Sequence, residues 1–147
     1  MKSRLVSAVS TGAAVLALAG CSSPPPEYNP PPGALVAGTA QVTVDGQDAG
    51  TTESVRCEPA GSLMSISTGS DESGTSVLID SREELIVREV SISDLGGFTG
   101  SYNDGLGGEA SATLTDRTYE ITGTADGFQT DNPSFRSSAS FQIKIAC

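Results

Sequence analysis

The chain has no histidine and no tryptophan, and basic residues are scarce. Without histidine, the Ser-His and Cys-His systems that activate most protein nucleophiles are impossible. Only 8 Lys and Arg stand against 18 Asp and Glu, which gives a formal net charge of −10. Nucleic acids and anionic lipid headgroups bind cationic patches that release their counterions. The composition therefore argues against both kinds of partner.

The remaining polar residues offer weak candidates for catalysis. Two carboxylate pairs, Asp71-Glu72 and Glu83-Glu84, are adjacent in sequence, but neighbouring acids in an acidic chain are typical of a solvated surface. A Ser-Lys dyad would need Lys144, which falls on the solvent-facing parity of its expected strand. No G-x-S-x-G elbow is present. We therefore expect a protein without catalytic activity.

One loop carries oxygen ligands of the kind that calcium prefers. Asn103-Asp104-Gly105 is followed by Glu109 in a glycine-rich stretch. The spacing does not match an EF-hand, and Asn-Asp-Gly is common in ordinary turns. We read this segment as a turn and predict neither a metal nor another cofactor.

The N-terminus has the pattern of a secretory signal. Lys2 and Arg4 precede an uncharged, mainly apolar run over residues 5–19. That run is 15 residues long, whereas a membrane-spanning helix needs roughly 20. It ends in Leu18-Ala19-Gly20-Cys21, which matches the lipobox of bacterial lipoproteins. The alternative is an ordinary signal with a chance cysteine at its end; we favour a signal peptide over residues 1–20 and lipidation of Cys21.

A lipidated Cys21 would anchor the mature chain to a membrane without spanning it. One acyl chain binds only marginally, but a diacylglyceryl group holds firmly. Cleavage would remove Lys2 and Arg4 and leave 6 basic against 18 acidic residues, a balance of 6 − 18 = −12. Such acidity suits a head that stays in solution above a charged surface.

The segment after Cys21 is a proline-rich tail, which we place at residues 21–34. It holds six of the chain's 8 prolines. Proline fixes φ and removes a backbone donor, so this tail is expected to lack regular structure and to act as an extended spacer. Recognition of the prolines by an aromatic groove is the alternative.

The other two cysteines form an even pair. In an exported and oxidising setting, Cys57 and Cys147 are expected to form a disulfide. Unpaired thiols are one alternative, and metal ligation by two cysteines without histidine is another.

Residues 35–147 show the alternation of short β-strands. The clearest case is the end of the chain, where Ala139, Phe141, Ile143 and Ile145 alternate with polar residues. Turns are expected at Asp45-Gly46 and Asp116-Arg117. We predict an all-β domain, an antiparallel sandwich or a small barrel of seven to eight short strands.

Other details of this β-domain are also predicted. Pro59-Ala60-Gly61 should end a strand, and residues 101–108 and 126–135 should be loops. In the strand over 85–93, Ile86, Arg88, Val90 and Ile92 share one parity. Six aromatic residues are expected to belong to the core or cap the sheets rather than line a ligand cleft: Phe98, Tyr102, Tyr119, Phe128, Phe135 and Phe141.

Taken together, these motifs resemble the mycobacterial 19-kilodalton lipoprotein antigen family. The most specific are the run Tyr119 to Ala125 (YEITGTA) and the terminal segment Ser140 to Cys147 (SFQIKIAC), beside the lipobox, the Val-Asp-Gly turn and Val55-Arg56-Cys57. The resemblance implies an envelope lipoprotein whose acylated N-terminus is sensed by host Toll-like receptor 2. Cys21 matches the family's lipidation site, and Cys57 and Cys147 match its paired cysteines.

The resemblance does not extend to the tail. The better-known family member has a Thr/Ser-rich, glycosylated tail, whereas this one is Pro-rich, with only Ser22 and Ser23 close to the cysteine. Glycosylation is therefore not carried over to this chain.

Two functions follow as hypotheses. The first is a non-enzymatic antigen, anchored through Cys21 at the extracytoplasmic face of the membrane or in the outer envelope. The second is an envelope carrier that binds a small apolar ligand or lipid in its β-domain. The two hypotheses differ in the size of the internal apolar cavity: a carrier should have a pocket of at least a few hundred Å³, and a close-packed sandwich should not.

Overall fold

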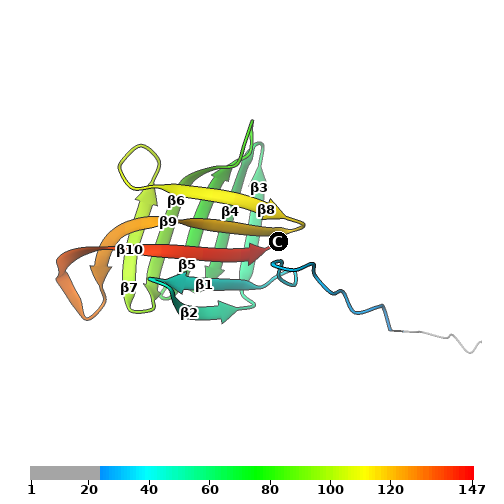
Figure 1. Cartoon of the computed structure of the whole chain (residues 1–147), viewed down its shortest axis with the longest axis horizontal. Helices are drawn as coiled ribbons and strands as arrows, with labels where there is room; N and C mark the ends of the chain where they lie inside the picture. Colours follow the sequence, from blue (N-terminus) through cyan, green and yellow to red (C-terminus); the bar gives the residue numbers. More distant parts are fainter. Residues whose placement is uncertain (1–23) are drawn as a thin grey trace, which may run out of the picture.

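A computed structural model describes residues 24–147 of the chain. The expected signal peptide and Cys21 lie outside these residues. The described part contains ten β-strands (Figure 1). They are β1 (Ala40–Val44), β2 (Gln47–Thr52), β3 (Val55–Ala60), β4 (Leu63–Gly69), β5 (Gly74–Asp80), β6 (Ile86–Leu95), β7 (Phe98–Asn103), β8 (Ala110–Thr115), β9 (Thr118–Gln129) and β10 (Asn132–Ala146). The all-β prediction is confirmed.

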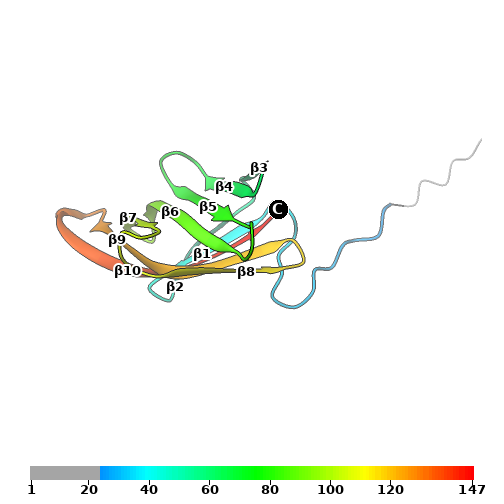
Figure 2. The same cartoon turned by 90° about the horizontal axis from the view of Figure 1, so that it is seen from above.

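All the strands belong to one antiparallel sheet that curls into a nearly closed, barrel-like shape. Its order is β2-β1-β10-β9-β7-β6-β5-β4-β3, with β8 attached to β9. Figure 1 shows β8, β9, β10, β1 and β2 running across the strands β3 to β7, and Figure 2 shows these two layers from above. The fold thus combines features of both predicted forms, a sandwich of two layers made from one curled sheet.

β9 connects the two layers. Residues 118–123 of β9 pair with β8, and residues 126–129 pair with β7. Glycines lie opposite each other at this junction, since Gly100 pairs with Gly127. A Cβ atom on Gly127 would lie 2.0 Å from the carbonyl oxygen of Thr99. Only glycine therefore allows β7 and β9 to approach this closely.

The core lies between the layers and is mainly aliphatic. Its largest fully buried side chains come from both layers: Phe98, Ile66, Ile79, Ile92, Ile121, Ile143, Ile145, Val77, Val87 and Val90. The predicted alternation at the end of the chain is confirmed, because Ala139, Phe141, Ile143 and Ile145 are all buried. Strands with one buried and one wet face produce this period of two.

The structure has more strands than the expected seven to eight, and β9 and β10 are longer than expected, because three segments gave little sequence signal. β2 has no apolar alternation, and five of its six residues are Gln, Asp, Gly or Thr. The expected loop over 101–108 begins with the end of β7. Most of the expected loop over 126–135 belongs to β9 and β10. In each case, pairing with neighbouring strands overrides weak local preference.

The strand ends within Pro59-Ala60-Gly61, as predicted, because β3 runs to Ala60. Pro59 itself still belongs to β3. β3 is the last strand in the sheet order, so one of its sides has no pairing partner. A proline lacks a backbone donor, which is tolerated at such an edge.

The predicted parity of β6 is also corrected. The register slips between Leu78 and Ile79, which face Glu89 and Val87 respectively. This β-bulge leaves Arg88 as an extra residue, so that both Val87 and Val90 are buried while Arg88 remains partly exposed. The simple alternation placed Arg88 on the same face as Val90. The bulge places Arg88 on the other face.

Two predicted turns are confirmed. Asp45 and Gly46 link β1 to β2 and both have positive φ, 49° and 76°. Asp116 has φ of 55° in the two-residue connection between β8 and β9. Both positions suit the primed turns of tight hairpins, which need left-handed residues. Among residues 24–147, no helix has the length and apolar character needed to cross a membrane.

Candidate functional site

The proline-rich tail lies against one end of the β-domain before it enters β1. Residues 24–39 contain turns but neither strand nor helix, in agreement with the prediction for the described part of the tail. The hydroxyl of Tyr28 donates a hydrogen bond to the carboxylate of Asp116. Farther along, the amide of Leu35 donates to Oγ1 of Thr118 at 2.9 Å. The tail is thus attached to the β8–β9 hairpin rather than extending freely over its whole length.

We call this end of the domain, formed by the β8–β9 turn, residues 34–39 and Cys147, the tail pole. Gly38 donates its amide hydrogen to the carbonyl of Ala146 at 2.8 Å, and Ala146 donates to the carbonyl of Thr39 at 2.9 Å. The amide of Cys147 donates to the carbonyl of Arg117 at 3.0 Å. Figure 1 shows the tail leaving the molecule beside the C-terminus. The segment that leads into β1 and the C-terminal end of the domain are therefore joined by backbone hydrogen bonds.

The environment of Tyr28 favours its neutral form. Its hydrogen bond to Asp116, some burial and the charge of Asp116 raise the pKa of the phenol, while the charge of Arg117 lowers it less. A protonated phenol is a donor, as the contact with the carboxylate requires. This contact was not predicted, and a lone tyrosine among prolines gives no signal for it.

The predicted disulfide is present. Cys57 on β3 and Cys147 after β10 are bonded, with their Cα atoms 6.1 Å apart. Cys57 is half-buried against the core and Cys147 is exposed. β3 is an end of the sheet order, and β10 lies in the other layer. The disulfide therefore joins the free edge of one layer to the other layer at the tail pole.

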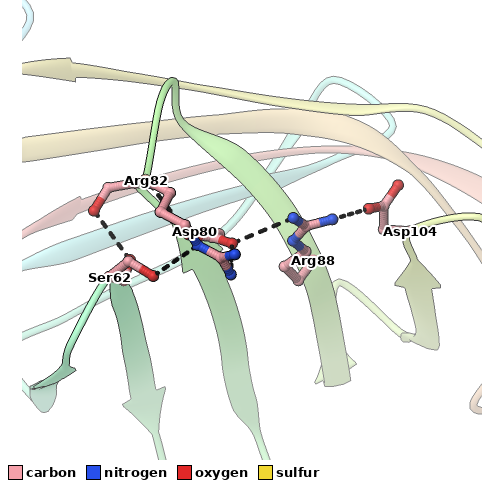
Figure 3. A network of polar contacts seen from close by, with 6 residues as sticks. Ser62, Asp80, Arg82, Arg88 and Asp104 are labelled. Carbon is pink, nitrogen blue, oxygen red and sulfur yellow. Dashed lines mark hydrogen bonds and ion pairs between the residues drawn. The ribbon is translucent and has the colours of Figure 1, made fainter.

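An ion-pair cluster lies on the outer face of the β5–β6 region (Figure 3). Asp80 at the end of β5 accepts hydrogen bonds from Arg82 at 3.0 Å and from Arg88 at 3.2 Å. Arg88 also binds Asp104 at 2.7 Å, and Nε of Arg82 donates to Oγ of Ser62 at 3.4 Å. The two guanidinium groups cover Asp80, whose side chain is only 3% exposed.

The cluster stabilises the charged form of Asp80. Burial raises the pKa of its carboxyl, but hydrogen bonds from Ser62, Arg88 and the backbone of Arg82, with the charge of Arg82, outweigh burial and lower it. Because Arg88 is the extra residue of the β6 bulge, the bulge directs its guanidinium toward this outer face. Sequence reasoning missed the cluster. The sequence offered one signal for it, the opposite charges of Asp80 and Arg82 two residues apart at a turn.

The structure does not bring the weak catalytic candidates together. Asp71 and Glu72 are exposed in the β4–β5 connection, and Glu83 and Glu84 are exposed in the β5–β6 connection, beyond the opposite end of β5. Lys144 lies opposite Gln41 and Glu120, on the parity away from the buried Ile143 and Ile145. This agrees with its predicted solvent-facing position.

The loop considered for calcium is a turn in which one carboxylate is already paired. Asp104 binds Arg88, and the amide of Leu106 donates to the carbonyl of Asn103 at 3.1 Å. Glu109 uses its carbonyl to accept from the amide of Thr124. In the part of the chain that the structure describes, no three His, Cys, Asp or Glu residues are grouped to hold a metal.

The aromatic residues agree only in part with the expected core or cap positions. Phe98, Tyr102 and Phe141 are buried, Tyr119 and Phe128 are half-buried, and Phe135 is 69% exposed. A hollow of about 500 Å³ opens between β2 and the β4–β5 turn. Val42 and Leu95 are the large apolar residues in its lining, and the others are Gly, Ser and Thr. None of the six aromatics lines this hollow, but Phe128 and Tyr119 each line another surface hollow.

Comparison with known proteins identifies the family. The model of the family described as Mycobacterium 19 kDa lipoprotein antigen matches residues 33–147, which include all ten strands and both bonded cysteines. The chain belongs to this family. The family resemblance inferred from the lipobox, the YEITGTA run and the terminal SFQIKIAC segment is thereby confirmed.

Individual relatives carry matching names. A putative lipoprotein of Mycobacterium avium subsp. hominissuis is 36% identical over 148 residues, covering 100% of this chain and 97% of its own. A putative lipoprotein of Mycobacterium indicus pranii is 35% identical over the full length of both chains. Lipoprotein LpqH of Mycobacterium tuberculosis H37Rv is 34% identical over 108 residues, 73% of this chain and 68% of LpqH. Family membership thus points to an envelope lipoprotein anchored to a membrane.

Proposed function

We propose that this family member is a non-enzymatic lipoprotein antigen, cleaved after Gly20 and anchored by acyl chains on Cys21. The observation that carries the proposal is the match of residues 33–147 to the lipoprotein antigen family, together with the lipobox that ends at Cys21. The tail pole adds where the anchor would hold the domain. Tyr28 and Leu35 fix the path of the tail seven and fourteen residues after Cys21. An extended chain covers at most about 3.5 Å per residue. A lipid on Cys21 would therefore hold the tail pole within roughly 25 Å of the bilayer.

The intact mass of the membrane-extracted protein tests the anchor. The expected mass lacks residues 1–20, gains a diacylglyceryl group and lacks two hydrogens for the disulfide. The matched variant is Cys21→Ser, which removes the proposed lipid site and leaves the β-domain unchanged. We expect this variant to leave the envelope fraction during a detergent-free wash. A Cys21→Ser protein that stays with the envelope as the parent does would refute the anchor.

We further propose that the acylated N-terminus is the part sensed by host Toll-like receptor 2. Support comes from the family resemblance, in which Cys21 is the matching residue. Reporter cells that express the receptor should respond to the membrane-extracted parent and not to Cys21→Ser at equal protein concentration. An equal response to both proteins would assign sensing to the β-domain instead.

Carriage of a small apolar ligand is a second candidate function. The hollow of about 500 Å³ between β2 and the β4–β5 turn favours it, because such a volume accommodates a small ligand and reaches the core residue Val42. Organic extraction of the purified protein, followed by mass spectrometry, should then release a bound apolar molecule. Loss of that molecule in Leu95→Asp, at a half-buried residue of the lining, with retention in the surface variant Val36→Asp and unchanged circular dichroism in both, would place it in the hollow. Extracts without any such molecule would reject this candidate.

A further inference from the structure

Among the described strands, β2, β3 and β8 pair with a neighbour on one side only. Free edges can add strands from other chains, and proteins commonly protect them with charges, proline or bulges. β2 carries the exposed Asp48, and its pairing with β1 is irregular between Val42 and Thr43. β3 carries Arg56, Glu58 and Pro59. Both of these edges are therefore protected.

β8 has none of these protections. Its sequence, ASATLT, contains no charge, proline or glycine, and its pairing with β9 is regular. Figure 1 shows β8 as the outermost strand of its layer. An uncharged edge is unexpected in a chain with 18 acidic residues. β8 is thus the edge best suited to pair with another strand.

The hydrogen-bond pattern shows which β8 groups face outward. The amide of Thr124 donates to the carbonyl of Glu109 at 3.0 Å, so this pair is of the hydrogen-bonded kind. Such pairs alternate along an antiparallel ladder, so Ser111, Thr113 and Thr115 bond to β9. The backbone N–H and C=O groups of the residues between them, Ala110, Ala112 and Leu114, therefore point to the free edge.

We propose that this edge pairs with β8 of a second copy of the chain, antiparallel and about a two-fold axis at Ala112. In this register Ala112 faces Ala112 of the second copy, and Ala110 faces Leu114. The three outward-pointing residues of each copy then meet as hydrogen-bonded pairs, so that every free group of the edge gains a partner. Leu114, which is 47% exposed, packs beside a small alanine.

Charge favours a second copy as the occupant. The net negative charge of the chain disfavours self-association wherever carboxylates would meet. Self-pairing of β3 would set Arg56, Glu58 and Pro59 at the interface, and self-pairing of β2 would set Asp48 there. Residues 110–114 meet themselves without any charged side chain. A two-fold interface requires such self-complementarity, and β8 provides it.

Cysteine cross-linking of the full-length protein in envelope vesicles tests this register. Hydrogen-bonded pairs have Cα atoms about 5.5 Å apart, within the range for disulfides. Ala112→Cys should therefore give a covalent dimer of twice the mass under mild oxidation. The matched control is Ala110→Cys, since the two copies of residue 110 would be roughly 13 Å apart along the strands. The parent protein controls for the native cysteines.

Dimer from Ala112→Cys, with little from Ala110→Cys or the parent, supports the proposal. Equal dimer from both variants, no dimer, or an adduct of another mass overturns it.

A second pair of variants separates pairing from a folding defect. Thr113→Lys places a charge on the β8 edge, and Thr51→Lys places the same charge on the protected edge β2. In the Ala112→Cys background, Thr113→Lys should reduce the dimer at least about threefold, and Thr51→Lys should not. Equal effects of the two lysines would also refute β8 pairing.

Discussion

Removal of the Cys57–Cys147 disulfide should destabilise the domain strongly. The bond closes a loop with a sequence separation of 90 residues. In the chain-entropy model, such a loop lowers the entropy of the unfolded chain by an amount worth about 4–5 kcal/mol at 25 °C. Small domains are typically stable by only about 5–15 kcal/mol. The double variant Cys57→Ala/Cys147→Ala should therefore lose a large fraction of its stability.

The expected shift in Tm follows from the size of the domain. Residues 35–147 give an unfolding entropy of roughly 240 cal/mol/K, at about 2.1 cal/mol/K per residue. A loss of about 4.6 kcal/mol then lowers Tm by roughly 19 °C. Thermal unfolding followed by circular dichroism, together with urea titration, measures both quantities. The variant should also show a larger m value than the oxidised parent, because an uncrosslinked unfolded chain exposes more surface.

Reduction of the parent protein provides the control for lost side-chain contacts. Cys57 is half-buried against the core, so its replacement by alanine also removes sulfur packing. The reduced parent keeps both sulfur atoms and should lie close to the double variant. A stability loss below about 1 kcal/mol in both forms would refute the reasoning, because the closed loop would then not restrict the unfolded chain.

Three further predictions concern the tail, the ion-pair cluster and the core. Tyr28→Phe should change Tm little, because exposed substitutions usually do. It should speed amide hydrogen exchange in the tail, because the tail loses its hydrogen bond to Asp116. Unchanged exchange would count against attachment of the tail to the β8–β9 hairpin. Asp80 has a pKa below its unfolded value of 3.8, so its contribution is present above about pH 4 and is lost as pH falls through the lowered pKa. Asp80→Asn should thus be less stable than the parent at pH 6, with the Tm gap narrowing toward pH 2, and a constant gap would contradict this. Ile143 is 0% exposed. In urea titrations, Ile143→Ala should lower the free energy of unfolding by about 2–5 kcal/mol and Ile143→Val by about 0.5–1.5 kcal/mol. Equal losses in the two variants would show that no cavity forms.

The sequence predicted the features that depend on local pattern. Alternation at residues 139–145 identified a half-buried strand, and Asp45-Gly46 identified a turn that needs left-handed residues. The disulfide was predictable because an exported chain with an even cysteine pair tends to oxidise it. These inferences need no knowledge of which strands are neighbours.

The missed features depend on strand pairing across the sheet. β2 lacks apolar alternation and forms because β1 provides a partner. The β6 bulge is visible only from the slip opposite Leu78 and Ile79. That slip turns Arg88 outward, so the Asp80 cluster could not be placed by counting parity along one strand. A single extra residue reverses the side-chain assignment of one side of a bulge relative to the other, which is why register escapes sequence patterns.

The tail pole combines the path to the proposed anchor with the covalent closure of the fold. The tail enters β1, which pairs with β10 over residues 40–44, and β10 ends beside Cys147. A pull on the tail would therefore act first on the bonds of Tyr28 and Leu35 to the β8–β9 hairpin. It would then act on the bonds of Gly38 and Thr39 to Ala146, next to the disulfide. The disulfide transmits this load to β3 in the other layer. An anchored domain attached in this way resists separation of its layers where the tether applies force, which a disulfide at the opposite end would not provide.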